Sequence, residues 1–243
     1  TSSVSANTES GFSIVSYTGN ETNNATVGHG LGKSPDWVII KDRDSNTAGN
    51  NWYVFHSALA SGHYVKLNQT SATTAVSGTS NGGVGSVTST TFNFVQGTTG
   101  NNKNVNENGD NFIAYCWTSI AGYSSMGSYK GVSASGTSGE ADGPYVHCGF
   151  KPAWILIKQS SGTNNWIVTD IKRDTKNPTT GWLYPDLAYQ EESDSGRYLD
   201  ILSTGFKIRS PGSGFNTDGE TYIYVAFAEQ PGGTAFDTFP NAH

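Results

Sequence analysis

The chain has 243 residues, of which only 14% are charged, with a formal net charge of −6 and a pI near 5.3. Because nucleic-acid binding needs clustered Lys and Arg to neutralise phosphates, this balance excludes a nucleic-acid partner and disfavours an anionic membrane surface. No apolar run approaches the roughly 18 residues of a membrane-spanning helix, so membrane insertion is not expected either. A content of 30 Gly and 12% aromatic residues is typical of an all-β protein.

Segments rich in Val, Ile, Trp, Tyr and Phe recur along the chain between clusters of Gly, Asn, Ser and Pro. This spacing predicts short strands joined by turns, and no window shows helical periodicity with caps at both ends. The expected strands are 12–18, 37–41, 52–56, 64–67, 91–95, 112–117, 126–130, 154–158, 166–170, 182–184, 205–209 and 222–228. The polar segments 70–90 and 97–110 are expected to form loops or short edge strands. We therefore predict an all-β fold of β-sandwich units of a jelly-roll or lectin-like type.

Much of this pattern occurs twice. Ser-Tyr-Thr-Gly at 16–19 returns as Ser-Tyr-Lys-Gly at 128–131, and Asn-Asn-Trp occurs at 50–52 and at 164–166. Pro-Asp-Trp-Val-Ile-Ile-Lys, ending at Lys41, returns as Pro-Ala-Trp-Ile-Leu-Ile-Lys, ending at Lys158. A tandem duplication of a unit of about 110 residues follows, a period far longer than those of solenoids and propellers. The expected division is an N-terminal arm 1–10, repeat units 11–123 and 124–232, and a C-terminal tail 233–243.

Several expected strands are apolar throughout, among them 37–40, 154–157 and 222–227. A sheet with one wet face should alternate apolar and polar residues, so these unbroken runs predict cover on both faces. We expect the two units to pack together and the chain to form a homo-oligomer. Two pairs of tryptophans occupy matching positions in the two copies and are expected in the core: Trp37 with Trp154, and Trp52 with Trp166.

The second unit carries an individual segment, 172–198, with Trp182, Tyr184, Asp186 and Tyr189. A flat aromatic ring offers an apolar face to the C–H face of a sugar, and neighbouring polar side chains can bind its hydroxyls. These four residues are therefore the candidate ligand-binding residues, and a neutral, polar ligand such as a polysaccharide is the expected ligand class. A local core made by the same aromatic residues is the alternative.

Catalytic patterns are not found in the sequence. A sandwich glycanase would place two carboxylates across a groove, and no Glu-x-Asp-x-x-Glu string or Gly-x-Ser-x-Gly elbow occurs. The densest acidic run, Glu191, Glu192 and Asp194, lies in a polar stretch and is expected to be a solvated loop. We predict no enzymatic activity, no catalytic residue and no cofactor. A purely structural or adhesin module without a ligand is one alternative function, and a polysaccharide depolymerase that uses Asp186 and this acidic run is the less favoured one.

Metal sites are weakly indicated. The histidines form no His-x-x-x-His pair and the two cysteines form no Cys-x-x-Cys pair. Oxygen-bearing side chains at Asn104, Asn106, Asn108 and Asp110 resemble the opening of a calcium loop, but the closing Glu is missing. Asn-Gly between apolar runs is a hairpin signal, so a turn is the preferred interpretation of this loop. Cys116 and Cys148 lie in apolar patterns, and the sequence leaves their pairing open.

Two blocks of the sequence resemble a known family. They are Gly-Phe-Ser-Ile-Val-Ser-Tyr-Thr-Gly-Asn at 11–20 with Gly-His-Gly-Leu-Gly-Lys-Ser-Pro-Asp-Trp at 28–37, and Asp-Gly-Pro-Tyr-Val-His-Cys-Gly-Phe-Lys-Pro-Ala-Trp at 142–154. Together they look like an uncharacterised tandem-repeat domain family found in virion proteins of tailed bacteriophages, especially phages of marine bacteria and cyanobacteria. The likeness covers residues 11 to about 231. It implies an exposed structural role on the virion surface, as a tail fibre, appendage or capsid decoration with other virion proteins as partners, and it implies no catalytic residues.

Overall fold

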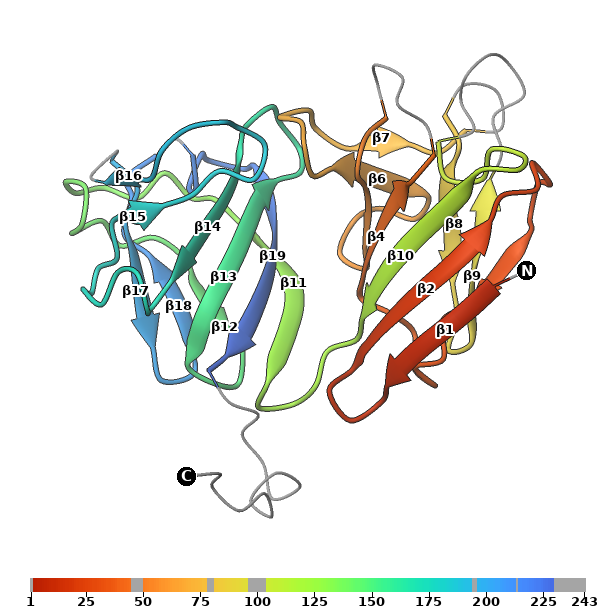
Figure 1. Ribbon diagram of the computed structural model, residues 1–243. Coiled ribbons are helices and arrows are strands. Elements are labelled where there is room, and N and C mark those ends of the chain that lie inside the picture. Colours follow the sequence, from red (N-terminus) through yellow and green to blue (C-terminus); the bar gives the residue numbers. More distant parts are fainter. Residues whose placement is uncertain are drawn as a thin grey trace. The chain divides into compact units, whose positions relative to one another are not determined.

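The computed structural model (Figure 1) describes residues 2–44, 50–77, 81–95, 104–193, 196–212 and 214–229. These residues contain strands and turns but no helix, and the strand pairs found among them are all antiparallel. The all-β prediction is therefore confirmed. No helix suited to crossing a membrane is present in the described ranges.

The chain divides into two compact units. Unit 1 consists of Thr1–Thr118, Ser160–Trp166 and Pro185–Leu187, and unit 2 consists of Ser119–Gln159, Ile167–Tyr184 and Ala188–His243. The division after Thr118 lies close to the boundary expected at residue 123. The sequence did not indicate that two short segments from the second half would join unit 1. Backbone hydrogen bonds hold the longer of them, since the N–H of Thr73 donates to the carbonyl oxygen of Ser160 at 2.9 Å.

Unit 1 is built from two facing sheets. Its strands are β1 (Ser2–Asn7), β2 (Phe12–Thr18), β3 (Thr26–Gly28), β4 (Trp37–Asp42), β5 (Tyr53–His56), β6 (His63–Lys66), β7 (Thr74–Ala75), β8 (Gly83–Val87), β9 (Thr91–Val95) and β10 (Asn111–Trp117). The larger sheet has the order β1-β2-β10-β4-β5-β6-β7, and the smaller sheet has the order β3-β9-β8. This is a β-sandwich-like arrangement.

Aromatic stacking organises the core of unit 1. The rings of Tyr17 on β2 and Phe112 on β10 stack with centroids 5.1 Å apart and an interplanar angle of 10°. Phe94 on β9 stacks on Tyr17 from the smaller sheet at 5.3 Å. Burying each such side chain stabilises the fold by about 1.5–3 kcal/mol. The remaining buried members of this cluster are Val15, Val27, Leu31, Val38, Ile40, Tyr53, Tyr64, Val84, Phe92, Val105, Ala114 and Cys116.

Unit 2 contains most of the remaining strands. They are β11 (Ser124–Lys130), β12 (Tyr145–His147), β13 (Pro152–Gln159), β14 (Trp166–Asp170), β15 (Gly181–Trp182), β16 (Glu192–Ser193), β17 (Leu199–Leu202), β18 (Gly205–Ile208) and β19 (Thr221–Ala228), with Trp166 itself grouped with unit 1. The sheets have the orders β11-β19-β13-β14, β12-β18-β17 and β15-β16. The first two orders match β2-β10-β4-β5 and β3-β9-β8 of unit 1, strand for strand.

The core of unit 2 uses a related set of contacts. Tyr129 and Tyr222 stack at 5.0 Å and 10°, and Phe206 meets Tyr224 edge-on at 5.4 Å. Tyr224 lies opposite Gly127, where an added Cβ would be only 2.9 Å from its ring. At the matching place in unit 1, Val15 lies opposite Ala114. The volume that two medium side chains fill in unit 1 is therefore filled by one large side chain in unit 2.

A glycine after β2 and another after β11 allow two backbone segments to touch. A Cβ on Gly19 would lie 2.0 Å from the carbonyl oxygen of Glu107, and a Cβ on Gly131 would lie 2.1 Å from that of Thr217. No real Cβ tolerates such distances, so the backbone can approach this closely only at glycine. This contact explains why Ser-Tyr-x-Gly occurs in both halves of the sequence.

A buried asparagine fixes the same region of each unit. In unit 1 the Oδ1 of Asn106 accepts from the N–H of Asn20 at 3.0 Å, and its Nδ2 donates to the oxygen of Thr22 at 3.2 Å. In unit 2 the Oδ1 of Asn216 accepts from the N–H of Val132 at 2.8 Å, and its Nδ2 donates to the oxygen of Ser210. Both side chains satisfy backbone groups that would otherwise be costly to bury.

Every expected strand overlaps a strand of the structure, and β4, β13 and β19 are buried on both faces over most of their length. The expected N-terminal arm 1–10 contains β1, which pairs with β2 over six residues. The expected tail 233–243 lies outside the described residues. The finer jelly-roll or lectin-like assignment stays a prediction.

Candidate functional site

The segment 172–198 forms a surface on unit 2 that we call the insertion surface, defined by Arg173, Leu183, Tyr189, Glu191 and Glu192. Its framework is the short β15–β16 pair, in which Gly181 lies opposite Ser193 and Trp182 lies opposite Glu192. Figure 1 shows this pair beside β14. A pair of two-residue strands has little stability of its own, so side-chain contacts must hold it in place.

Asp174 anchors the start of this surface. Its Oδ2 accepts hydrogen bonds from the backbone N–H groups of Thr180 at 2.5 Å and Gly181 at 2.8 Å, and from the hydroxyl of Thr179 at 3.0 Å. Burial alone would raise the pKa of Asp174, but the hydrogen bonds from Thr180, Lys176 and Gly181 outweigh it and lower the pKa to about 2. The carboxylate is therefore ionised at neutral pH and holds the turn that leads into β15.

Trp182 lies in the interior of unit 2 and is fully buried. Its indole N–H donates to the carbonyl oxygen of Arg197 at 3.0 Å, and its ring packs edge-on against Phe215 at 4.8 Å. Its partner is thus the protein itself, and its ring is not available to an external ligand. Trp182 therefore belongs to a local core, which is the alternative interpretation that the sequence left open for this segment.

Tyr184 is also buried, with 7% of its surface exposed. Its hydroxyl donates to the Oε2 of Glu192 at 2.5 Å and accepts from the Nη1 of Arg197 at 2.7 Å. The guanidinium of Arg197 also lies over the Tyr184 ring, 5.6 Å from its centroid. The three side chains form one linked group in which the Tyr184 hydroxyl bridges an acid and a base.

A second charged group holds Glu191. The Nη1 of Arg173 contacts the Oε1 of Glu191 at 2.5 Å, and its Nε contacts the Oδ2 of Asp170 at 2.5 Å. Both glutamates of the acidic run therefore have guanidinium partners, while Asp194 lies outside the described residues. Neither Arg173 nor Arg197 was among the residues predicted from the sequence. Both lie in the same segment as the glutamates, in a chain with few cations, and this pattern could have indicated the ion pairs.

Tyr189 is the candidate that does face solvent. It is 67% exposed, and Leu183, six residues earlier in the same segment, is 36% exposed. Asp186 is placed elsewhere: it groups with unit 1, where its Oδ1 accepts from the N–H of Trp166 at 3.2 Å. Of the four predicted ligand-binding residues, one is exposed on the insertion surface, two lie inside unit 2, and one belongs to the other unit.

The calcium candidates lie in a turn of unit 1. The N–H of Asp110 donates to the oxygen of Glu107 and Gly109 has a φ of 88°, so a turn lies here. It is not the expected hairpin, because Asn108 lacks the positive φ of a type I′ turn and β10 pairs with β2 and β4 rather than with β9. Asn104 donates its Nδ2 to the oxygen of Gly82 at 3.3 Å, and the carboxamide of Asn106 binds the 20–22 segment. Asn108 follows in the same turn. Among the described residues, no group of three or more His, Cys, Asp or Glu is arranged to hold a metal ion.

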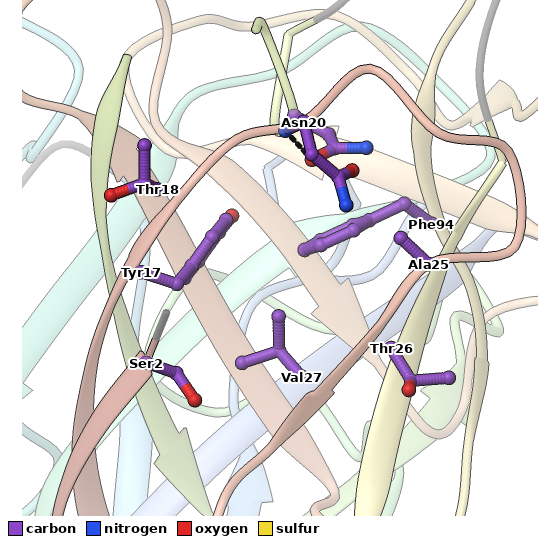
Figure 2. Close-up of a pocket in the computed structure, with 9 residues that line it drawn as sticks. Ser2, Tyr17, Thr18, Asn20, Ala25, Thr26, Val27 and Phe94 are labelled. Carbon is purple, nitrogen blue, oxygen red and sulfur yellow. Dashed lines mark hydrogen bonds between the residues drawn. The ribbon is translucent and has the colours of Figure 1, made fainter. Parts of the chain in front are cut away.

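Two small cavities lie at the start of β1. One of about 160 Å³ is shown in Figure 2, where Ser2, Tyr17 and Phe94 surround the hollow and Asn20 lies above it. The other, of about 220 Å³, is lined by Ser3, Ser16, Thr18, Arg43, Asn111 and other residues of the same region. Ligand pockets usually exceed about 300 Å³, so neither cavity indicates a site for a sugar ring. They mark the place where β1 lies against the edge of the sandwich.

The two cysteines are free thiols, one in each unit. Burial raises the pKa of Cys116 to about 12, and burial likewise raises that of Cys148 to about 12. Neither group is therefore a nucleophile at neutral pH.

Comparisons with known proteins identify the family to which the chain belongs. Searches of the curated proteins and of the solved structures found no match. A family model described as "Domain of unknown function (DUF7483)" matches residues 1–231 and so spans both units and the insertion surface. The chain therefore belongs to the DUF7483 family.

Proposed function

We propose that the chain is a non-enzymatic structural protein of a virion surface, built from two fused sandwich repeats of a jelly-roll or lectin-like type. It assembles as a homo-oligomer in a tail fibre, appendage or capsid decoration, and its insertion surface contacts a host-surface glycan. The observation that carries the glycan contact is Tyr189, an aromatic side chain of the insertion surface that is 67% exposed. The virion setting is supported by the sequence resemblance over residues 11–231.

The duplication is supported by contacts that occur in both units. The strand orders agree, and the stacked pairs Tyr17–Phe112 and Tyr129–Tyr222 have the same geometry. The close backbone contact of Gly19 matches that of Gly131, and the buried Asn106 matches Asn216. All of these contacts lie in the scaffold. The insertion surface is found in unit 2 alone, which favours it as the place where the protein acquired a specific contact.

The chemistry of the insertion surface favours binding over hydrolysis. Glycoside hydrolysis needs one carboxyl group as a proton donor and a second as a base or nucleophile, about 5 to 10 Å apart across a groove. Here Glu191 has Arg173 as a partner, and Glu192 has Tyr184 and Arg197. Both carboxylates are therefore held by contacts within the protein. An exposed aromatic ring such as that of Tyr189 instead suits a neutral, polar ligand.

A glycan array on the purified chain tests this proposal, with Tyr189→Ala as the test variant. Tyr189 is exposed, so its removal should not disturb folding, and binding should fall at least about tenfold because the stacking surface is lost. Tyr145→Ala is the matched control, since Tyr145 is an exposed tyrosine of the same unit outside the insertion surface. It should leave glycan binding unchanged.

Other outcomes separate the alternatives. No binding on the array and on host cells, or binding that Tyr189→Ala leaves intact, would favour a structural module without this ligand site. Release of reducing ends from host polysaccharide, abolished by Glu192→Gln, would instead favour a depolymerase. Light scattering on the purified chain tests the homo-oligomer, and a monomer at micromolar concentration would contradict it.

A further inference from the structure

The large sheets of the two units end differently at one edge. In unit 1, β2 pairs with β10 on one side and with β1 on the other, whereas in unit 2 β11 pairs with β19 and is the last strand of its sheet. The backbone N–H groups at matching positions of β2 and β11 point in the same direction relative to the inner neighbours β10 and β19. The N–H of Gly19 donates to Asp110 at 2.9 Å, and the N–H of Gly131 donates to Glu220 at 2.9 Å. Because ladder bonds alternate along an antiparallel strand, Ser16 and Ser128 both direct their N–H groups away from the inner neighbour.

In unit 1, β1 fills this edge. Ser3 lies opposite Ser16 in the ladder. All six residues of β1 are exposed, so its backbone contacts with β2 account for most of its attachment. Its apolar side chains, Val4 and Ala6, also cover Gly30. A Cβ added to Gly30 would lie 3.0 Å from the Cγ1 of Val4 and 3.1 Å from the Cβ of Ala6.

In unit 2 the equivalent edge is only partly covered. The N–H of Ser124 donates to the oxygen of Ile120 at 2.9 Å, and the N–H of Met126 donates to the Oγ of Ser119 at 3.3 Å, so the preceding turn covers the first residues of β11. Farther along, at Ser128 and Lys130, no backbone hydrogen bond reaches this edge from any residue that the structure describes.

The surface beside this open edge is also uncovered. Gly149 has a φ of 82° and follows β12, as Gly30 with a φ of 73° follows β3. A Cβ on Gly149 would meet only the Nε2 of His147, at 4.0 Å. Two apolar side chains of this region are exposed, Val132 by 50% and Tyr145 by 45%. An exposed strand edge without a proline or a bulge is a template for strand addition.

We propose that Ser128 and Lys130 of β11, together with Val132, Tyr145 and Gly149, form an acceptor edge that binds an extended segment of another polypeptide by strand addition. Within the described residues the chain has two such edges and one strand that fills such an edge, β1. If β1 of one copy moved to the β11 edge of another copy, it would leave the β2 edge of its own copy open. β1 shows the chemistry of a segment that fits such an edge: an uncharged strand with small polar residues alternating with Val or Ala. The proposed occupant is a segment of this kind from a different protein.

A labelled peptide of residues 1–8, Thr-Ser-Ser-Val-Ser-Ala-Asn-Thr, is the probe. Fluorescence anisotropy on the full chain should show saturable binding. Ser128→Pro should weaken it by about tenfold or more, because proline removes the N–H that the added strand needs. The fold should tolerate this change, since the Ser128 N–H faces away from β19 and proline is accepted on edge strands. A peptide with proline at positions 3 and 5 should not bind.

Three further variants keep the test decisive. Ser16→Pro, the matched change in unit 1, should release β1 to proteolysis and leave peptide binding at unit 2 intact. If Ser128→Pro impairs folding, the exposed substitutions Val132→Asp and Tyr145→Asp should weaken binding in a folded protein.

Three results would overturn the proposal. One is the absence of saturable binding, and another is binding that survives Ser128→Pro but is lost in Ser16→Pro. The third is an oligomer of the chain that dissociates when residues 1–8 are deleted, because the occupant would then be β1 of a second copy. None of these readouts depends on a glycan.

Discussion

The hydroxyl of Tyr17 donates a 2.6 Å hydrogen bond to the carbonyl oxygen of Val105 inside the first unit. In the second unit the hydroxyl of Tyr129 donates to the carbonyl oxygen of Phe215 at 3.0 Å. Burial raises the pKa of both phenols well above the usual value, so both remain protonated donors at any ordinary pH. The first bond ties β2 to the loop before β10, and the second ties β11 to the loop before β19.

Tyr17→Phe and Tyr129→Phe should each destabilise the protein by about 1–3 kcal/mol, because a buried carbonyl loses its donor. Urea unfolding curves measure the effect. Tyr145→Phe is the control: Tyr145 is exposed and bonds Thr204 at the surface, so its change should stay within about 0.5 kcal/mol. Equal curves for all three variants would contradict a structural role for the buried hydroxyls.

Gly19→Ala and Gly131→Ala should be among the most destabilising substitutions in the chain, each costing about 3 kcal/mol or more, since the added methyl would overlap a backbone carbonyl oxygen. Thermal unfolding of purified variants tests this expectation. Gly28→Ala serves as the control because a Cβ there would lie 3.7 Å from its nearest neighbour, an ordinary contact. A melting temperature for Gly19→Ala equal to that of Gly28→Ala would show that the loop moves aside.

Asp174→Asn should destabilise the insertion surface in a pH-dependent manner. The pKa of Asp174 in the folded protein is about 2, below the ordinary value of 3.8. The stabilisation is therefore complete above about pH 4 and is lost as the pH falls through 2. Limited proteolysis between residues 172 and 198 should show faster cleavage of the variant at neutral pH. That difference should shrink between pH 4 and pH 2, and a difference that stays constant would contradict the assignment.

Both cysteines should resist alkylation in the native protein. With pKa values of about 12, the thiolate fraction at pH 8 is very small, and Cys116 is fully buried. Iodoacetamide labelling followed by mass spectrometry should give little modification without denaturant and two modified sites in urea. Fewer than two sites in urea without reductant would reveal a disulfide and contradict the free-thiol state.

Trp182→Ala should destabilise the second unit by about 3–5 kcal/mol, as expected for removing a fully buried indole. The loss should appear as a lower urea midpoint, followed by the fluorescence of the remaining tryptophans, among them Trp154 of the same unit. Trp182→Phe should recover part of the stability, because the ring contact with Phe215 is retained. A midpoint equal to that of the unmodified chain would place Trp182 at the surface instead.

The sequence predicted the strands well because most of them bury apolar side chains in recognisable patterns. It missed β1 because Ser-Ser-Val-Ser-Ala-Asn buries nothing: the strand exists through backbone pairing, which leaves no mark on the side chains. It also missed the position of Asp186. This residue groups with unit 1 and contacts Trp166 there, which cannot be inferred from local composition.

The candidate site was predicted in part. Composition identified the segment 172–198 but could not decide which aromatic residues face inward. The order Trp182-Leu183-Tyr184 contains a usable signal, since a strand alternates its faces and the structure buries the first and third residues while exposing the second. Tyr189 lies beyond this alternation, in a stretch without a strand pattern, and only the structure shows that it is exposed.

The opposed pairs Val15–Ala114 and Gly127–Tyr224 limit which strands the two units could exchange. A chimeric chain that set Val15 against Tyr224 would overfill its interior, and one that set Gly127 against Ala114 would leave a void. A strand from one unit could therefore replace its counterpart in the other only together with the strand that lies opposite it.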